Sequence, residues 1–180
     1  QFQPRGLESR VQPREQEHRE TEVSQGRVEK EPHPLGLNAK QLTSYLGKSA
    51  SICELLRLRL HISVMNHVHT HVALGSLRQL IRKGGAPLTV EGERFVGAIL
   101  ERAAALAFEG QYDTSNLVRM LSHASKLRVL PTPPALDAIL GCMFKLAQSC
   151  IAKDASDFLR LLGDWGVRPG PALEHLLQNR

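Results

Sequence analysis

The chain of 180 residues has few of the features that define disulfide-linked domains or membrane proteins. Its three cysteines, Cys53, Cys142 and Cys150, are odd in number and widely spaced, and no two form a Cys-x-x-Cys pair. This pattern argues against a disulfide framework or a zinc knuckle, so buried free thiols in a reducing compartment are expected. No apolar run approaches the roughly 20 residues of a membrane-spanning helix. We therefore expect no membrane insertion.

Aromatic residues and catalytic motifs are also scarce. Aromatics make up 4% of the sequence, which argues against RNA binding by stacking bases on a row of exposed rings. The sequence contains no Gly-rich phosphate loop, no Ser-His-Asp arrangement, no nucleotide fingerprint and no paired carboxylates in a strand context. We therefore expect a protein that is not an enzyme, with no catalytic residue, no cofactor and no small-molecule substrate.

Histidines gather in one short stretch, where His67, His69 and His71 alternate and His61 precedes them. Zinc would need two of these on one helical face, as His67 and His71 could be, together with a third or fourth ligand. No His-Glu-x-x-His arrangement is present. We expect no metal site and interpret these side chains as facing solvent or RNA at the start of a helix.

Residues 113–149 carry the strongest helical signals. Asp113 can cap a first helix, whose apolar side chains recur at helical spacing. Prolines end that helix, and Pro134 can begin a second one that extends to Ser149, because a proline in the first turn costs no hydrogen bond. Two helices joined by a short connection form an antiparallel hairpin. The apolar residues of the first helix are Leu117, Met120, Leu121 and Ala124.

This hairpin recurs on either side of itself. Residues 76–85, 116–125 and 157–166 align without a gap, and each segment is followed by a proline and then by an apolar helix. A repeat of about forty residues suits two helices and two turns, and such hairpins must stack to bury their apolar faces. The pattern predicts an all-α fold, a short α-solenoid of hairpins at about 71–107, 113–150 and 154–180. We expect burial of Leu117, Leu121, Ile139, Leu140, Phe158 and Leu162.

Two of the hairpins share a further set of residues. The middle one contains Gln111, Asp113, Ser115, Asn116, Leu117, Leu121, Ser122 and Ala124, and the last one contains Asp154, Ser156, Asp157, Phe158, Leu162, Trp165, Gly166 and Pro169. These residues resemble the core of octotricopeptide and heptatricopeptide repeats, which are related to repeats in FAST-kinase-like and RAP-domain proteins. The resemblance covers residue 74 to the C-terminus. It implies work on organellar RNA, either in transcript processing, stabilisation and translation or within an organellar ribosome.

The segment before the repeats differs in composition. Residues 1–35 carry charges of both signs with little apolar periodicity, so we expect an extended arm held by other molecules. Residues 36–180 form the helical domain. Because the chain begins with Gln1, we expect that an upstream segment, such as a cleaved transit peptide, is absent from it.

Several capping residues and one buried helix are also predicted. Asn38, Thr89 and either Ser49 or Ser51 are expected as N-caps, and Asp154 and Asp157 are interpreted as caps rather than catalytic acids. Apolar residues occupy most of the circumference of residues 51–65, so we expect a centrally buried helix there, with Arg57 and Arg59 reaching out.

The formal net charge is +5, and basic residues recur in the three hairpins. In a stacked array such residues align into a stripe that suits a phosphate backbone. The candidate RNA-binding residues are Arg78, Arg82, Lys83, Arg119, Lys126, Arg128, Arg160 and Arg168.

These patterns favour an RNA-associated structural protein, most concretely a subunit of a mitochondrial ribosome in the matrix that binds rRNA and neighbouring proteins. A plastid is the alternative compartment. Two alternative functions remain open: a protein-binding helical scaffold or accessory subunit of another large organellar complex, and a free RNA-maturation factor. The last of these usually has many more repeats.

Overall fold

The computed structural model describes residues 38–85 and 87–179, and these residues fold into helices joined by short connections. No strand occurs in these two ranges, so the prediction of an all-α fold is confirmed. The arm predicted for residues 1–35 lies outside the described residues. None of the helices described is long and apolar enough to cross a membrane.

The described residues form eight α-helices and two short 3₁₀ helices. In chain order these are α1 (Ala39–Lys48), α2 (Ile52–Arg57), η1 (Leu58–Val64), α3 (His67–Gly84), α4 (Val90–Phe108), α5 (Thr114–Lys126), α6 (Pro133–Leu146), η2 (Ala147–Ser149), α7 (Ala152–Asp164) and α8 (Pro171–Gln178).

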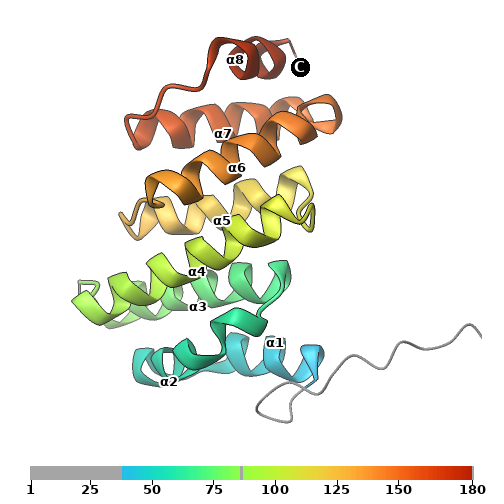
Figure 1. Ribbon diagram of the computed structural model, residues 1–180. Coiled ribbons are helices and arrows are strands. Elements are labelled where there is room, and N and C mark those ends of the chain that lie inside the picture. The colour runs from blue at the N-terminus through green and yellow to red at the C-terminus, as the bar shows by residue number, and fades with distance from the viewer. Residues whose placement is uncertain (1–37, 86, 180) are drawn as a thin grey trace, which may run out of the picture. The chain divides into compact units, whose positions relative to one another are not determined.

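The helices pack in a regular order (Figure 1). Helix α3 packs between α1 and α5, and α5 packs in turn against α7. On the other side of this row, α4 lies along α6 and also contacts α2 and η1. The two helices of each predicted hairpin therefore belong to two different rows, and residues far apart in sequence become neighbours along each row.

Local sequence signals set most of the helix ends. Asn38, Ser51, Thr89 and Asp113 each accept a hydrogen bond from a backbone N–H of the first turn, as predicted. Thr132 caps α6, which begins at Pro133, one residue earlier than predicted. The predicted second helix of this hairpin ends at Leu146, and a single 3₁₀ turn continues to Ser149.

One continuous hydrophobic cluster joins the helices. Five of the six side chains expected between the hairpins are fully buried, and the sixth, Leu140, is only half-buried at the edge of this cluster. Trp165 is the C-cap of α7 and packs against the core, and Gly166 then turns the chain with a positive φ. Cys142 and Cys150 are buried free thiols, whereas Cys53 is exposed, contrary to the prediction that all three are buried.

The prediction of a centrally buried helix at residues 51–65 is wrong. Helix α2 ends at Arg57, and a 3₁₀ helix follows in which Leu60 is 79% exposed and Val64 is 40% exposed. A 3₁₀ helix turns every three residues instead of every 3.6, so the apolar side chains point in directions that the α-helical pattern does not anticipate. Arg57 and Arg59 are exposed, as predicted.

The prediction that Asp154 and Asp157 cap α7 is also wrong. The N-cap is Ile151, and Asp154 lies buried in the first turn, where its carboxylate accepts a hydrogen bond from the Ser115 hydroxyl of α5. Asp157 lies further along the helix and pairs with Arg160 at 3.2 Å. Asp154 thus joins two neighbouring helices instead of ending one.

Candidate functional site

Basic side chains and histidines line one edge of α3. His71, Gly75, Arg78 and Arg82 recur at intervals of four, three and four residues, which places them in one row along the helix. On the neighbouring helix α5, Arg119, His123 and Lys126 recur in the same way. Each helix therefore presents a row of nitrogen-containing side chains.

The two rows meet at the packing interface between α3 and α5. The rings of His71 and His123 lie with their centroids 5.0 Å apart and their planes tilted by 38°. A Cβ atom added to Gly75 would lie 3.3 Å from Nε2 of His123, so the absence of a side chain at Gly75 is what lets this imidazole approach α3. We refer to His71, Gly75, Arg78, Arg119, His123 and Lys126 together as the α3–α5 seam.

Burial and positive charge determine the protonation of these histidines. Burial, followed by the nearby positive charges of the seam, lowers the pKa of His123 from 6.5 to about 4. The charges that act on it belong to His71, Arg78, Lys126 and Arg119. Burial and the Arg119 guanidinium also lower the pKa of His71. Both imidazoles are therefore neutral near pH 7. The electrostatic potential around them is positive because the neighbouring side chains are basic.

The seam carries no paired acid. Among the described residues, the ion pairs within 4.0 Å join Arg102 to Glu109 and Arg160 to Asp157 and Asp164. The three cations of the seam, Arg78, Arg119 and Lys126, take part in none of them. The Nδ1 atoms of His71 and His123 are buried without a hydrogen-bond partner in the described part of the chain. Within the described ranges, the seam therefore combines three cations that form no ion pair with two imidazoles whose Nδ1 atoms have no partner.

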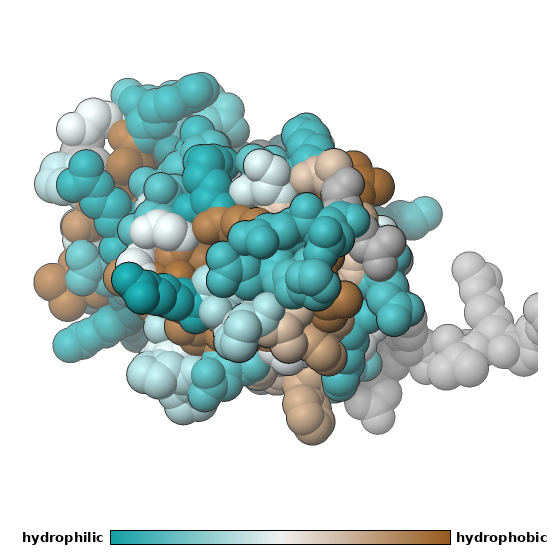
Figure 2. Space-filling view, turned by 90° about the horizontal axis from the view of Figure 1, so that it is seen from above, coloured by the Kyte–Doolittle hydropathy of each residue, from teal (hydrophilic) through white to brown (hydrophobic). Residues whose placement is uncertain are grey.

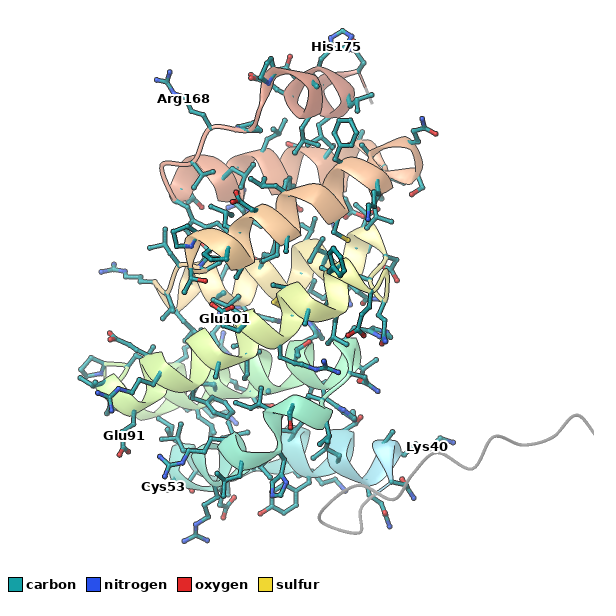
Figure 3. The ribbon with its side chains drawn as sticks, viewed as in Figure 1. Lys40, Cys53, Glu91, Glu101, Arg168 and His175 are labelled. Carbon is teal, nitrogen blue, oxygen red and sulfur yellow. The ribbon has the colours of Figure 1, made fainter. Side chains whose placement is uncertain are left out.

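The structure brings only part of the predicted RNA-binding set together. Arg78, Arg119 and Lys126 converge on His123, and Arg82 and Lys83 are exposed in the last turn of α3. Arg160 on α7 is held by two carboxylates of its own helix. Arg168 extends outward from the connection between α7 and α8 (Figure 3). The eight residues thus do not form one continuous row.

Arg128, which completes the predicted set, has an unusual backbone conformation. It follows α5 with φ of +59°, and it is the one non-glycine residue with positive φ in the described ranges. The backbone N–H groups of Arg128 and Val129 donate to carbonyls of the last turn of α5. After α7 the corresponding position is Gly166, with φ of +67°. An arginine therefore occupies a left-handed position that glycine adopts at lower conformational cost.

Buried polar contacts hold α3 in place against its neighbours. The backbone N–H of Asn66 donates to Nδ1 of His69 at 3.2 Å, so the proton of the neutral ring is on Nε2, 2.9 Å from the carbonyl oxygen of Ala39. His69 is buried, so the prediction that it faces solvent or RNA is wrong. His67 is half-buried and packs edge-on against Tyr112. No group of metal-ligating side chains occurs among the described residues.

A hollow lies on the side of α3 that faces α1. It has a volume of about 650 Å³ and lies between the connection from α1 to α2 and the C-terminal half of α3. Its lining includes Lys48, Ser76, Gln79 and Lys83. The hollow extends the polar, basic surface of α3 toward α1.

An apolar groove occupies a different part of the protein. It lies between α2 with η1 and the start of α4, has a volume of about 330 Å³ and is lined by Leu56, Leu60, Ile62, Phe95 and Ala98 with Arg59, Glu91 and Arg94. Cys53 and Glu91 both point outward in this region (Figure 3). Figure 2 shows the protein from above, turned by 90° from the view of Figure 1. Most of this face is hydrophilic, with hydrophobic areas between the hydrophilic side chains.

Sequence reasoning did not identify His123 or Gly75 as site residues. The ungapped alignment places residues 76–85 beside residues 116–125, whereas the seam brings Gly75 next to His123. An alignment of repeats identifies equivalent positions, and it does not say which side chains of neighbouring helices touch, so it could not point to this contact. The sequence signal that could have identified His123 is its position in one row with Arg119 and Lys126 on the same edge of a helix.

Comparison of the chain with protein-family models, with curated proteins and with solved structures gives no match.

Proposed function

We propose that this protein binds RNA through the sugar-phosphate backbone and that the α3–α5 seam is the centre of the binding surface. The observation that carries the proposal is that the rings of His71 and His123 meet between two rows of cations, and that Arg78, Arg119 and Lys126 of these rows take part in no ion pair within 4.0 Å among the described residues. Concentrating positive charge without compensation is destabilising for a protein alone and favourable when a polyanion supplies the negative charge.

The geometry favours backbone contacts over base recognition. The exposed surface of α3 and α5 offers guanidinium and ammonium groups, which form charge-assisted hydrogen bonds with phosphate. Lys48 and Lys83, which line the hollow on the α1 side of α3, are two further donors outside the seam. Arg128 supports the same proposal because the chain keeps an arginine where glycine would be less strained.

The order of the helices supports a repeat protein. Helices α3, α5 and α7 form one row, and α4 and α6 lie along each other in a second row (Figure 1). We propose a short α-solenoid, with the arm of residues 1–35 bound to other molecules. Together with the resemblance of residues 111–124, this makes an organellar ribonucleoprotein, and most concretely a mitochondrial ribosome, the proposed setting.

Replacement of the seam cations tests RNA binding directly. A variant with Arg78→Gln, Arg119→Gln and Lys126→Gln should bind a short single-stranded oligouridylate more weakly, with little loss of folded structure. Each lost phosphate contact should remove about 0.7 from the slope of log affinity against log salt concentration. Fluorescence anisotropy at several salt concentrations measures both effects, and circular dichroism checks the fold.

Arg160→Gln is the matched control because this exposed arginine is already paired with Asp157 and Asp164. It should change the RNA affinity and the salt slope little. The control removes one charge and the triple variant removes three, so a loss in the control of about one third of that in the triple variant would show that net charge, and not the seam, governs binding. An unchanged affinity in the triple variant would contradict the proposal.

A protein-binding scaffold is the second candidate, and the exposed Leu60 beside the apolar groove favours it. Arg57, Arg59 and Arg94 surround this groove, with Glu91 as the one acid in its lining. The charge balance suits an amphipathic helix of a partner protein with acidic residues beside its apolar face. Leu60→Gln should then remove partner binding and leave RNA affinity unchanged, whereas the triple variant of the seam should do the reverse.

A further inference from the structure

The α3–α5 seam combines two features that a purely electrostatic RNA surface does not need. Its cations would attract phosphate without any help from histidine. Yet two imidazoles from different helices meet at its centre, with ring centroids 5.0 Å apart. The glycine at residue 75 leaves the space that the His123 ring occupies.

In the part of the chain that the structure describes, no hydrogen-bond partner holds the Nδ1 atom of either imidazole in one protonation state. Neither Nδ1 atom has a hydrogen-bond partner among the described residues, in contrast to His69, whose two nitrogens are both engaged. The charged groups that act on the two rings come from the two helices of the seam, His71 and Arg78 from α3 and Arg119 and Lys126 from α5, and all of them are basic. No acid of α1, α4 or α7 contributes to that field.

We infer that the α3–α5 seam is a phosphate site at which His71 and His123 take up protons as an RNA phosphate binds at the outer edge of the two helices, where Arg119 and Lys126 are exposed. The inference rests on the proposed RNA binding and adds the chemistry of its central contact. A bound phosphate brings negative charge next to both rings and offers oxygen acceptors for imidazolium N–H donors. The protonated rings, which the free protein disfavours, become favourable in the complex.

Proton uptake has a definite consequence for affinity. In the free protein the pKa of both histidines is lowered, and a phosphate next to them raises it, so the complex holds more protons than its separated components. By linkage, affinity must then increase as the pH decreases from about 8 to about 5.5, by up to about tenfold per pH unit for each proton taken up.

The experiment measures oligouridylate affinity of the full chain across this pH range at fixed ionic strength. The wild-type protein should bind more tightly at low pH, whereas a double variant, His71→Gln with His123→Gln, should lose most of that dependence and still bind at about pH 8. His175→Gln is the matched control because His175 is exposed on α8 (Figure 3). Its pH dependence should equal that of the wild type.

A second variant keeps the test valid if the double variant folds poorly. Arg119 is exposed, and its charge lowers the pKa of both histidines. Arg119→Gln should therefore raise both pKa values in the free protein while it weakens binding. Histidine proton resonances recorded against pH, with and without inorganic phosphate, measure the pKa values directly. Phosphate should raise the pKa of His71 and His123.

The outcomes separate the two proposals. If the double variant and the wild type bind RNA with the same pH dependence, the phosphate site is wrong and the RNA-binding proposal stands. If phosphate shifts the two pKa values but no RNA binds at any pH, the site stands as an anion site and the RNA proposal is wrong. An absence of any shift with phosphate overturns the inference.

Discussion

The hydroxyl group of Tyr112, just before α5, lies 2.7 Å from Oγ1 of Thr70 on α3, and both side chains are buried. Thr70 Oγ1 also lies 2.9 Å from the carbonyl oxygen of His67, to which it donates, so the proton between the two hydroxyls belongs to Tyr112. Burial raises the pKa of Tyr112 to about 12, which keeps this donor protonated. The contact fixes the start of α5 against α3 and hence the alignment of the seam.

Tyr112→Phe removes this donor without changing the shape of the core. We expect the free energy of unfolding to fall by about 1 kcal/mol, the usual contribution of one buried hydrogen bond. Urea denaturation followed by circular dichroism measures the loss. Tyr45→Phe is the control because Tyr45 is exposed on α1, and it should change stability little. Equal effects of the two substitutions would contradict the assigned hydrogen bond.

Ser115→Ala should be more costly because it leaves the carboxylate of Asp154 buried without its hydroxyl partner. An unsatisfied buried acceptor costs about 1–3 kcal/mol. Adding Asp154→Ala should recover part of that loss, since the unpaired group is then gone, and a double-mutant cycle from urea denaturation gives the coupling energy. Additive losses in the double variant would show that the two side chains do not interact. Ser156→Ala, at an exposed position of α7, is the control.

His123 should make the folded protein sensitive to acid. Its pKa is 6.5 when unfolded and about 4 when folded, so the unfolded chain binds more protons between these values. Stability is therefore highest above about pH 6.5 and falls as the pH decreases toward 4. His123→Gln should reduce this decrease in urea denaturation measured at several pH values. Inorganic phosphate should reduce it in the wild type as well. An unchanged pH profile in His123→Gln would show that other groups govern acid unfolding.

Arg128→Gly should separate stability from function. Relief of the left-handed conformation at this residue should stabilise the protein by up to about 1 kcal/mol. The same substitution removes a cation of the proposed RNA surface, so RNA affinity should fall as thermal stability rises. Lys153→Gly, at an exposed position in the first turn of α7, is a control that removes a charge without relieving strain. If Arg128→Gly leaves RNA affinity unchanged, Arg128 lies outside the binding surface.

Substitution of Leu55 should reduce stability strongly, whereas substitution of Leu60 should reduce it little. Leu55 is fully buried, and Leu55→Ala should cost about 2–5 kcal/mol. Leu60 is 79% exposed, and Leu60→Gln should change the free energy of unfolding by less than about 0.5 kcal/mol. Urea denaturation of the two variants provides the comparison. A large loss in Leu60→Gln would mean that this side chain is part of the core.

The sequence by itself determined most of the helices and most of the places where they begin. Asn38, Thr89 and Asp113 cap helices because a polar side chain at that position accepts a hydrogen bond from the first turn, an interaction within a few residues. The apolar spacing of α4, α5 and α7 likewise determined which faces became buried, since burying one face is the main stabilisation available to an amphipathic helix.

Only the tertiary structure decided which side chains meet. Asp154 looked like a cap, yet it pairs with Ser115 on another helix, and the seam joins Gly75 to His123 across 48 positions of sequence. Such contacts depend on the lengths of the helices and on how far one slides along the other, quantities set by packing of the whole core. The change from α2 to a 3₁₀ helix, which exposes Leu60, depends on the same packing. Helix propensity and apolar periodicity describe neighbouring residues only, so they cannot predict the packing between distant helices.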